Sequence, residues 1–360
     1  MQSAMAQVSV VIVCMGDPAV HLYACLDSLF AQNRTPLEVW VVAYLMQAEH
    51  REALAARYPA IRIIESGEVR GFAENNNLAL RQIDSEYCFV VNDDTLQSMP
   101  VVDLLLEDLK KLPENAAAVQ PKIVFGDGRV QTCGRTPWTA WRYAKHYLHL
   151  VDEGRTEGGI GSRISGHPRP APEGQVSPGG RQGDRISLPE REGPTAVPIG
   201  TLRDGRGRSE AEAIRESMPP SVVRTYTLNG ACFLIKTAVF RKMGWFDERY
   251  FFTPEDIALG HALNDAGYSV WVHPEVCITH LAGGSVSAME QAIKPARVRG
   301  SLIFYGEPLA LKLFIWSVEL ARYVKNSLLC REQNRKTARN VMKTVFSKQT
   351  PKEIFIRFKP

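Results

Sequence analysis

The chain has 360 residues, 45% of them hydrophobic, so it is long enough for a sizeable α/β core or two modest domains. Its net charge is only +4, and no uncharged run approaches the ~18–20 residues that a membrane-spanning helix requires. These bounds exclude a protein built from spanning helices and predict a globular chain.

The strands and helices expected in the first 125 residues alternate. Runs rich in β-branched residues predict strands at 8–13, 38–42, 61–64, 87–91 and 117–125. The first helix is expected to start at Asp17-Pro18, with Leu22, Leu26, Leu29 and Phe30 on its apolar face. Further helices are expected at 47–57, 72–81 and 100–112. This order predicts an α/β fold with a mostly parallel central sheet and helices on both faces, whose ligands bind beyond the carboxyl ends of the strands.

The composition changes between residues 151 and 222. This stretch contains 13 Gly and 9 Pro and has no aromatic residue, a Pro and Gly share of about 31% that is typical of disorder. We predict a low-complexity, disordered insertion over 151–222, which could act as a lid if it lies near the acceptor side.

Order is expected to resume after the insertion. The patterns predict a strand at 224–235, helices at 237–243 and 255–265, a strand at 268–272, and helices beyond residue 291. The predicted divisions of the chain are therefore 1–150, 151–222, 223–290 and a basic helical extension over 291–360.

Charge is unevenly distributed. Residues 322–360 carry 11 Lys and Arg residues against Glu332 and Glu353, a net charge of +9. The rest of the chain carries about −5, the difference between +4 and +9. A basic tail of this kind indicates either an anionic partner, such as phospholipid, polyprenyl phosphate or nucleic acid, or a solvated helix.

An amphipathic pattern precedes the tail. The stretch 308–329 is apolar but broken by Lys312, Glu319, Arg322 and Lys325, and most of these charges lie off one helical face that is formed by Leu309, Leu313, Trp316, Leu320 and Tyr323/Val324. Such a helix either lies in a membrane interface or packs on the core, and amphipathicity alone does not separate the two.

The cysteines and the N-terminus bear on the compartment. The seven cysteines form no C-x-x-C pair, which predicts reduced thiols and a cytoplasmic location. The apolar stretch 8–15 is too short for a signal peptide and is expected to be a strand.

Asn92-Asp93-Asp94 follows a predicted buried strand. Asp93 and Asp94 are hard oxygen ligands, suited to Mg²⁺ or Mn²⁺ bridged to phosphate. The alternative is a turn or a helix cap, because Asp, Asn and the neighbouring Thr95 are common in both.

Glu255-Asp256 opens a predicted helix after Pro254. One of these carboxylates could be a general base for an acceptor hydroxyl. The alternative is an ordinary acidic first turn, which the helix dipole favours. The aromatic residues of the preceding segment 246–252 could line a sugar pocket.

His280 ends an apolar run and is followed by Gly283-Gly284. A histidine at a strand end is either structural or a ligand, and the two glycines would let backbone approach a phosphate. Upstream, the segment 70–77 (RGFAENNN) joins a strand to a helix, and its three consecutive Asn residues predict either ligand hydrogen bonding or capping.

These segments together resemble the inverting family 2 glycosyltransferases with the GT-A fold, especially the rhamnosyl- and galactofuranosyl-transferase branch. The matching pieces are VSVVIV, RGFAENNN, VVNDDT, TLNGACFLIK, GWFDERYFFTPEDIALGHALNDAGYSVWVHPEVCITHLAGGS and the helical C-terminus. They span most of residues 8–305 apart from the insertion. In this family residues 1–150 would be the half that binds the nucleotide sugar, and residues 223–290 the acceptor and catalytic half.

The resemblance implies a role for each motif. Asp94 with Asp93 would hold the metal and the donor diphosphate, and His280 would complete the site of Mg²⁺ or Mn²⁺. Asp256 would be the base and Glu255 would bind the acceptor. Asn76 and Gly71 would belong to the donor loop, and Gly283 and Gly284 to the phosphate approach.

Two segments depart from the family pattern. Cys14-Met15-Gly16 replaces the usual Thr-Tyr-Asn after the first strand, and residues 43–46 (AYLM) replace an Asp-Asn-x-Ser-x-Asp run after the second. Because these segments normally hold the base and ribose, they leave the donor's identity open.

The sequence therefore predicts a metal-dependent inverting glycosyltransferase that acts on a hydroxyl of a cell-surface glycan or lipid-linked saccharide. The expected location is the cytoplasm, with peripheral contact at the inner face of the plasma membrane through the basic tail. The alternative is a non-catalytic protein of the same fold that binds a glycan or a partner. A nucleotidyltransferase would require a Gly-rich basic loop after the first strand, which is absent here, and a nucleic-acid partner is not expected.

Overall fold

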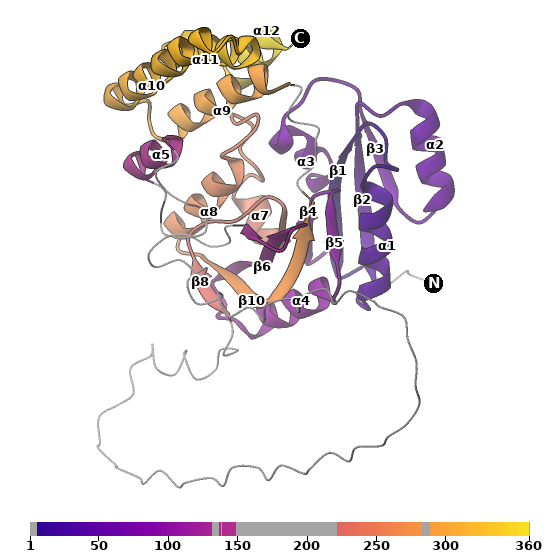
Figure 1. Cartoon of the computed structure of the whole chain (residues 1–360). Coiled ribbons are helices and arrows are strands. Elements are labelled where there is room, and N and C mark those ends of the chain that lie inside the picture. Colours follow the sequence, from indigo (N-terminus) through magenta and orange to yellow (C-terminus); the bar gives the residue numbers. More distant parts are fainter. Residues whose placement is uncertain (1–5, 132–136, 138, 149–221, 282–288, 360) are drawn as a thin grey trace, which may run out of the picture. The chain divides into compact units, whose positions relative to one another are not determined.

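The computed structural model describes residues 6–131, 137, 139–148, 222–281 and 289–359. Its centre is a sheet of ten strands covered by helices, with four further helices at the C-terminal end (Figure 1). The expected α/β class, the central sheet with flanking helices and the helical C-terminal extension are confirmed. The predicted insertion lies almost entirely outside the described residues, and the predicted domain boundaries stay predictions.

The strand order is β3-β2-β1-β4-β9-β6-β10-β5, with β7 beside β6 and β8 beside β10. The strands are β1 (Val8–Met15), β2 (Leu37–Tyr44), β3 (Arg62–Ser66), β4 (Tyr87–Val91), β5 (Thr95–Gln97), β6 (Ala116–Phe125), β7 (Val130–Gln131), β8 (Val223–Thr225), β9 (Cys232–Lys236) and β10 (Ser269–His280). Strands β3, β2, β1 and β4 are mutually parallel, and so are β6 and β10. Strand β9 is antiparallel to both β4 and β6, so it joins the two parallel blocks into one mixed sheet.

Both faces of the sheet are buried, which explains the continuous apolar runs of its strands. The helices are α1 (Leu22–Gln32), α2 (Ala48–Arg57), α3 (Phe72–Leu80), α4 (Val101–Lys111), α5 (Ala140–Tyr147), α7 (Thr237–Lys242), α8 (Glu255–Asp265), α9 (Glu290–Phe304), α10 (Leu309–Leu328), α11 (Glu332–Val345) and α12 (Pro351–Phe358). Side chains of α1, α2 and α4 pack with Val10 and Ile12 on one face of β1. Side chains of α3, α7 and α8 pack with Val11 on the other.

The structure corrects three sequence predictions. The expected strand over 224–235 is two strands, because β8 pairs with β10 whereas β9 pairs with β4 and β6. The expected strand over 268–272 continues to His280, with register shifts against β6. Helix α1 begins at Leu22 and not at Asp17-Pro18, because the Asp17 carboxylate accepts a hydrogen bond from the Ala19 amide in a turn before the helix.

The C-terminal helices form a core of their own. Helices α9, α10 and α11 bury Val298, Leu302, Ile315 and Val341 against α5, and the helices lie together at one end of the sheet (Figure 1). Helix α9 packs closely against Thr253 at Gly300. A Cβ at Gly300 would lie 2.7 Å from the carbonyl oxygen of Thr253. The extension is thereby held against the loop that precedes α8.

Helix α10 has two apolar faces. One buries Leu311 and Ile315 in the helical core. The other is exposed to solvent and consists of Leu309, Leu313, Trp316, Leu320 and Val324, between 37% and 64% exposed. The face that the sequence singled out therefore does not pack on the core of this chain. None of the helices in the described ranges has the length and apolar content of a membrane span.

Candidate active site

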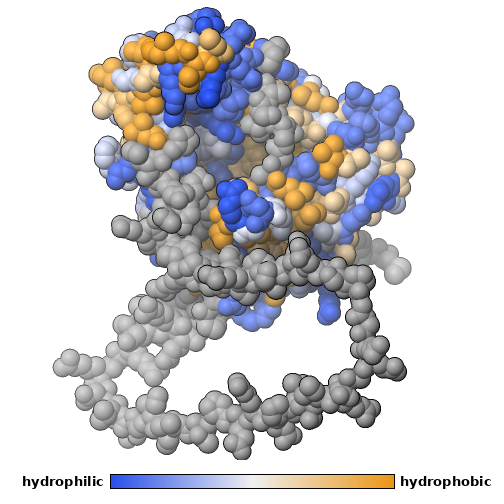
Figure 2. All heavy atoms as spheres, in the orientation of Figure 1, coloured by the Kyte–Doolittle hydropathy of each residue, from blue (hydrophilic) through white to orange (hydrophobic). Residues whose placement is uncertain are grey.

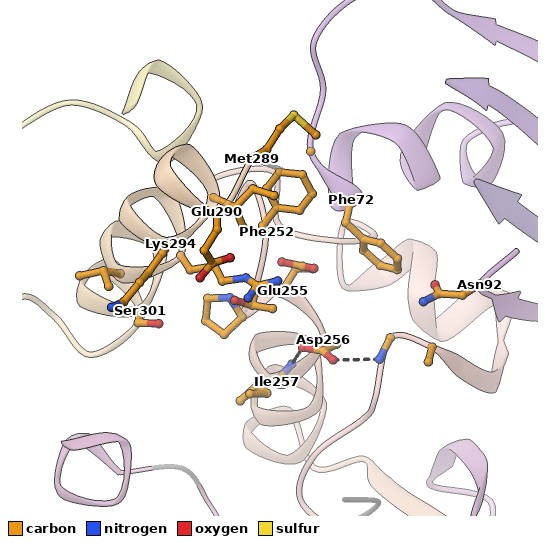
Figure 3. A pocket seen from close by; sticks show the side chains of 18 of the residues that line it. Phe72, Asn92, Phe252, Glu255, Asp256, Ile257, Met289, Glu290, Lys294 and Ser301 are labelled. Atoms are coloured by element: carbon orange, nitrogen blue, oxygen red, sulfur yellow. Dashed lines mark hydrogen bonds between the residues drawn. The ribbon is translucent and has the colours of Figure 1, made fainter. Parts of the chain in front are cut away.

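A pocket of ≈ 1260 Å³ lies at the carboxyl ends of the parallel strands and extends to the C-terminal helices. The residue after β4, the start of α8 and the inner side of α9 all contribute to it (Figure 3). Glu255 and Asp256 lie between α9 on one side and Phe72 and Asn92 on the other in this view (Figure 3). The pocket thus has a sheet end, a middle that contains the two carboxylates, and a helical end.

Asp93 and Asp94 form the turn between β4 and β5, so the helix-cap alternative does not apply to them. The turn is fixed by the Thr95 hydroxyl, which donates to the Asn92 carbonyl (2.9 Å), and by the Asn92 amide, which donates to the Ala231 carbonyl (3.0 Å). Burial, followed by the charge of Asp94, raises the pKa of Asp93 to about 6, and a hydrogen bond with the Cys14 thiol opposes this shift.

Asp94 lies beside His280 because β5 pairs with the end of β10, where Thr95 is opposite His280. The distance from Asp94 Oδ1 to His280 Nε2 is 3.0 Å. On its other side, His280 Nδ1 lies 2.8 Å from Gln131 Oε1. When Nδ1 donates to that oxygen, the lone pair of Nε2 is directed toward Asp94. Gln131 thereby orients the imidazole as the outer partner of a metal-binding histidine does.

We tested whether these side chains fit the divalent cation that the resemblance implies. Within the described ranges, no three His, Cys, Asp or Glu side chains converge as a set that would hold a metal. Asp94 and His280 nevertheless hold one carboxylate oxygen and one imidazole nitrogen 3.0 Å apart. This pair suits Mn²⁺ or Mg²⁺ when a diphosphate and water complete the coordination. The donor set therefore fits a cation that is shared with the donor.

One hydrogen bond connects the Asp256 carboxylate to the segment that leads into the sheet. Its Oδ2 accepts a hydrogen bond from the Gly230 amide (2.8 Å), and its Oδ1 accepts one from the Ile257 amide (2.7 Å). Gly230 leads into β9, which pairs with β4, the strand that ends at Asn92-Asp93-Asp94. The pairing of β4 and β9 therefore places Asp256 on the same pocket as Asp94.

Glu255 is only 5% exposed, and its Oε2 has no hydrogen-bond partner among the described residues. Burial, followed by the charge of Asp256, raises the pKa of Glu255, and the positive charge of Arg297 opposes the shift. A buried carboxyl that lines the pocket with an unpartnered oxygen is suited to hydrogen bonding a substrate hydroxyl.

The RGFAENNN segment forms the start of α3. Gly71 lines the pocket, and a Cβ at this position would lie 2.2 Å from the Phe251 carbonyl oxygen, so glycine is required by packing. Asn75 also lines the pocket and hydrogen bonds Ser66. Asn76 is 1% exposed, donates to the Phe72 carbonyl (2.9 Å) and is not a pocket residue. The geometry thus supports donor contact by Gly71 and Asn75 better than by Asn76.

Two further predictions concern the diglycine and the aromatic segment. Gly283 and Gly284 lie outside the described residues. In the aromatic segment, Phe246, Tyr250 and Phe251 are buried in cores, and only Phe252 reaches the pocket. The expected aromatic wall is therefore a single ring.

The segments that depart from the family pattern still border the pocket. Met15 is 39% exposed at the end of β1, and the Tyr44 phenol at the end of β2 accepts a hydrogen bond from the Arg70 amide (3.3 Å). Asp17 and His21 complete this sheet end. The departing segments therefore still line the pocket beyond β1 and β2, together with His21, which sequence reasoning did not single out.

Comparisons with known proteins bear on the family of the chain. The model of glycosyl transferase family 2 matches residues 9–156. The chain is a glycosyltransferase that is similar to this family over those residues. Together with the mixed sheet, this match confirms the expected GT-A fold of the glycosyltransferase.

Curated relatives match over nearly the full length. The N-acetylglucosaminyl-diphospho-decaprenol L-rhamnosyltransferases of Mycobacterium tuberculosis strains CDC 1551 / Oshkosh and ATCC 25618 / H37Rv are each 23% identical over 361 residues, which covers 95% of the glycosyltransferase and 99% of the relative.

Two solved structures are similar at lower identity. One is the mannosyltransferase PcManGT of Pyrobaculum calidifontis in complex with GDP-Man and Mn²⁺ (TM-score 0.48, 13% identity, 99% of this chain and 79% of that chain). The other is GalNAc-T7 with UDP, GalNAc and Mn²⁺ (TM-score 0.47, 11% identity), of which the alignment covers 77% of this chain and 44% of that chain.

Proposed function

We propose that this glycosyltransferase is inverting and moves a sugar from a nucleotide-diphosphate donor to a hydroxyl of a lipid-linked saccharide. The observation that carries the proposal is the placement of Asp256 and of the pair Asp94 and His280 on one pocket, through the paired strands β4, β9, β5 and β10. A binding module has no need of a carboxylate held in this way beside a donor site.

Asp256 is the proposed base. The amides of Gly230 and Ile257 each bind one of its oxygens, so the carboxylate has a fixed orientation. The acceptor hydroxyl loses its proton to Asp256 while its oxygen forms a bond to the anomeric carbon. The bond from that carbon to the diphosphate oxygen breaks, and the nucleoside diphosphate leaves with the electron pair. Attack from the side opposite the leaving group inverts the anomeric centre.

Asp94 and His280 would hold the cation, with Gln131 orienting the imidazole. A bound divalent cation offsets the charge that develops on the departing diphosphate. Asp93 is half-buried beside Asp94 and hydrogen bonded to Cys14, which favours a supporting role in shaping the turn. Glu255, with its raised pKa and unpartnered oxygen, would hydrogen bond the acceptor sugar.

The names of the curated relatives and the exposed apolar face of α10 support a lipid-linked acceptor. The M. tuberculosis relatives are named for a diphospho-decaprenol acceptor and rhamnosyl transfer. In the present chain, the exposed apolar face of α10 lies beside the hydrophilic surface of the neighbouring C-terminal helices (Figure 2). We infer that this face contacts the cytoplasmic surface of the membrane in which a lipid-linked acceptor resides, as part of polysaccharide synthesis.

The test is calorimetric titration with UDP, GDP and dTDP, each with and without Mn²⁺, on the wild-type protein and on Asp94→Ala. We expect metal-dependent binding of one nucleotide that the variant loses, which also names the donor to test in transfer. Failure of all three nucleotides to bind would overturn the proposal and favour a non-catalytic glycan- or partner-binding protein, consistent with the altered segments at Met15 and Tyr44.

A further inference from the structure

The helical end of the pocket is basic, whereas its sheet end is acidic. The helical end is lined by five cationic residues, which we call the basic wall: Lys294, Arg297, Arg322, Lys325 and Arg331. Only Glu290 and Glu319 oppose them among the pocket residues of α9, α10 and α11, so five positive and two negative charges leave +3. The sheet end is lined by Asp17, Asp93 and Asp94 against Arg70, so three negative charges and one positive charge leave −2 there.

We propose that the basic wall binds a phosphate or diphosphate ester carried by the acceptor, at a place separate from the donor diphosphate. This inference deepens the proposed function and rests on it. The donor diphosphate belongs at the acidic end, where a cation must stand between it and the aspartates. An anionic ester that needs no metal belongs where guanidinium and ammonium groups converge.

Two of the cations are fixed by a buried carboxylate. Glu319 is fully buried, and its Oε1 accepts from Lys294 Nζ (3.0 Å), Arg322 Nη1 (2.5 Å) and the Tyr147 hydroxyl (2.6 Å). The guanidinium of Arg322 also stacks over the Tyr147 ring, 4.9 Å from its centroid. One glutamate therefore holds two cations at the pocket wall and leaves a net positive charge there.

Arg297 links the basic wall to the catalytic carboxylates. Its Nε is buried and has no hydrogen-bond partner within the described part of the chain. Its charge acts on Glu255, where it opposes the rise in pKa that burial and Asp256 cause. Arg297 lines the pocket, and its buried Nε carries a donor that no described residue accepts.

Lys325 and Arg331 extend the wall outward along α10 and its junction with α11. Both are exposed, and within the described ranges neither has a carboxylate at ion-pair distance. Asn326 and Asn334 also line the pocket, and the Asn326 Nδ2 donates to the Arg322 carbonyl (2.7 Å). The cations that face solvent at the pocket are thus the ones without internal partners, as a site that captures an anion from outside requires.

The positions of the two carboxylates and of the basic wall predict how the acceptor lies in the pocket. Glu255 and Asp256 lie between α9 and the sheet end (Figure 3), so a sugar placed there has its phosphate-bearing side toward Lys294 and the rest of the basic wall. The exposed apolar face belongs to α10, the same helix that supplies Arg322 and Lys325. A lipid chain that leaves the diphosphate would therefore meet that helix.

The test uses farnesyl diphosphate as the probe, titrated calorimetrically into the full chain in the presence of EDTA. The variant is the double substitution Lys325→Ala and Arg331→Ala, because both side chains are exposed and do not support the core. The matched control is Arg339→Ala with Lys343→Ala, two exposed cations of α11 that do not line the pocket. We expect the first pair to weaken binding by about tenfold or more and the control pair to leave it unchanged.

Further arms distinguish the sources of the anion. Farnesol should not bind, and inorganic pyrophosphate should compete with farnesyl diphosphate if the diphosphate is the group recognised. Vesicles of phosphatidylglycerol test the lipid headgroup instead. A double variant that loses vesicle binding but keeps farnesyl diphosphate binding would overturn the proposal, and so would loss of that binding in Asp94→Ala.

The farnesyl diphosphate test of the basic wall and the nucleotide test of the proposed function can fail independently. Nucleotide binding with Mn²⁺ should be the same in wild-type protein and in the Lys325 and Arg331 variant. If no nucleotide binds but farnesyl diphosphate still does, the transferase proposal fails and the anion site stands. If a nucleotide binds and farnesyl diphosphate does not, only the anion site fails.

Discussion

The carboxylate of Asp256 accepts a hydrogen bond from the backbone amide of Gly230 at 2.8 Å. Gly230 leads into β9, and β9 pairs with the strand that ends at Asn92. One backbone contact thus couples the start of α8 to the edge of the sheet where the donor is proposed to bind. The position of Asp256 is consequently set by sheet pairing as well as by its own helix.

Replacing Asp256 with Asn should remove the base and keep the fold. An Asn oxygen still accepts from the Gly230 amide, whereas the NH2 group cannot accept from the Ile257 amide, so the side chain keeps one of its two backbone contacts. We expect the transfer rate to fall by about 10²-fold or more, while the nucleotide binds as before. The control is Asp265→Asn, an exposed position at the other end of α8 that does not line the pocket. Full activity in Asp256→Asn would exclude this residue as the base.

Gln131 should matter for metal-supported nucleotide binding although it would not touch the metal. Its Oε1 lies 2.8 Å from His280 Nδ1, and its loss frees the imidazole to rotate. We expect Gln131→Ala to weaken the Mn²⁺ dependence of nucleotide binding by about 10- to 100-fold, less than His280→Ala does. Gln82→Ala, at an exposed position of the helical turn after α3, is the control. Equal Mn²⁺ titrations in Gln131→Ala and wild type would contradict the role.

Most of the fold and the main motifs followed from the sequence. Buried parallel strands produce continuous apolar runs, so β1, β2, β4 and β6 were predictable within a few residues. Asp94, Asp256 and His280 stand at the ends of such elements, where periodic patterns stop, and the resemblance assigned a role to each. The pocket brings these three residues together, as the resemblance implies.

The residues that sequence reasoning missed have no local signal. Gln131 belongs to a two-residue strand, and only the pairing of β7 with β6 places it beside His280. Arg297 is an ordinary arginine in a helix, and only the approach of α9 at Gly300 places it near Glu255. Contacts between elements far apart in sequence cannot be read from periodicity, which reports only which face of an element is buried.

Glu255 should make stability depend on pH with a definite sign. Its folded pKa is raised by burial and by Asp256, with Tyr250 also near and Arg297 opposing. The native state therefore binds more protons than the unfolded state at pH values above 4.5, the ordinary pKa of a glutamate, and stability falls as pH rises through this window. Glu255→Gln removes the effect. The free energy of unfolding of the variant, relative to that of wild type, should therefore increase by at most about 1.4 kcal/mol for each pH unit.

The measurement is urea unfolding of both proteins at pH values from 4.5 upward. A difference in unfolding free energy that does not change with pH would show that Glu255 ionises normally. Transfer activity should fall in the same variant even where it is the more stable protein, because the amide replaces a carboxyl that faces the acceptor. Glu49→Gln, at an exposed position of α2 outside the pocket, is the control for both readouts.

Gly71 should tolerate no side chain. A Cβ at this position would lie 2.2 Å from the Phe251 carbonyl oxygen, and the Phe72 amide next to it donates to the same oxygen at 3.0 Å. Gly71→Ala must push the start of α3 away from Phe251, so we expect a loss of about 1–3 kcal/mol in the free energy of unfolding. Gly67→Ala in the same loop meets no atom within 4 Å and should cost far less. Similar unfolding midpoints for the two variants would contradict this packing.

The exposed apolar face of α10 should bind membranes. Leu313 and Leu320 are 50% and 39% exposed, and no charged side chain interrupts the face on which they lie. Burying such a face in a lipid interface removes apolar surface from water, and the +9 of residues 322–360 adds attraction to anionic lipid. Leu313→Glu with Leu320→Glu places two negative charges there and should reduce sedimentation with phosphatidylglycerol vesicles by about tenfold or more.

Two comparisons separate this membrane contact from a general effect of charge. Phe30→Glu adds a negative charge at an exposed aromatic residue of α1, which is 43% exposed, and should leave vesicle binding unchanged. High salt should weaken binding by the wild type only in part, because the electrostatic share is screened whereas apolar burial is not. Complete release by salt, together with normal binding by the Leu313 and Leu320 variant, would mean that the basic tail acts alone and that this face of α10 serves another partner.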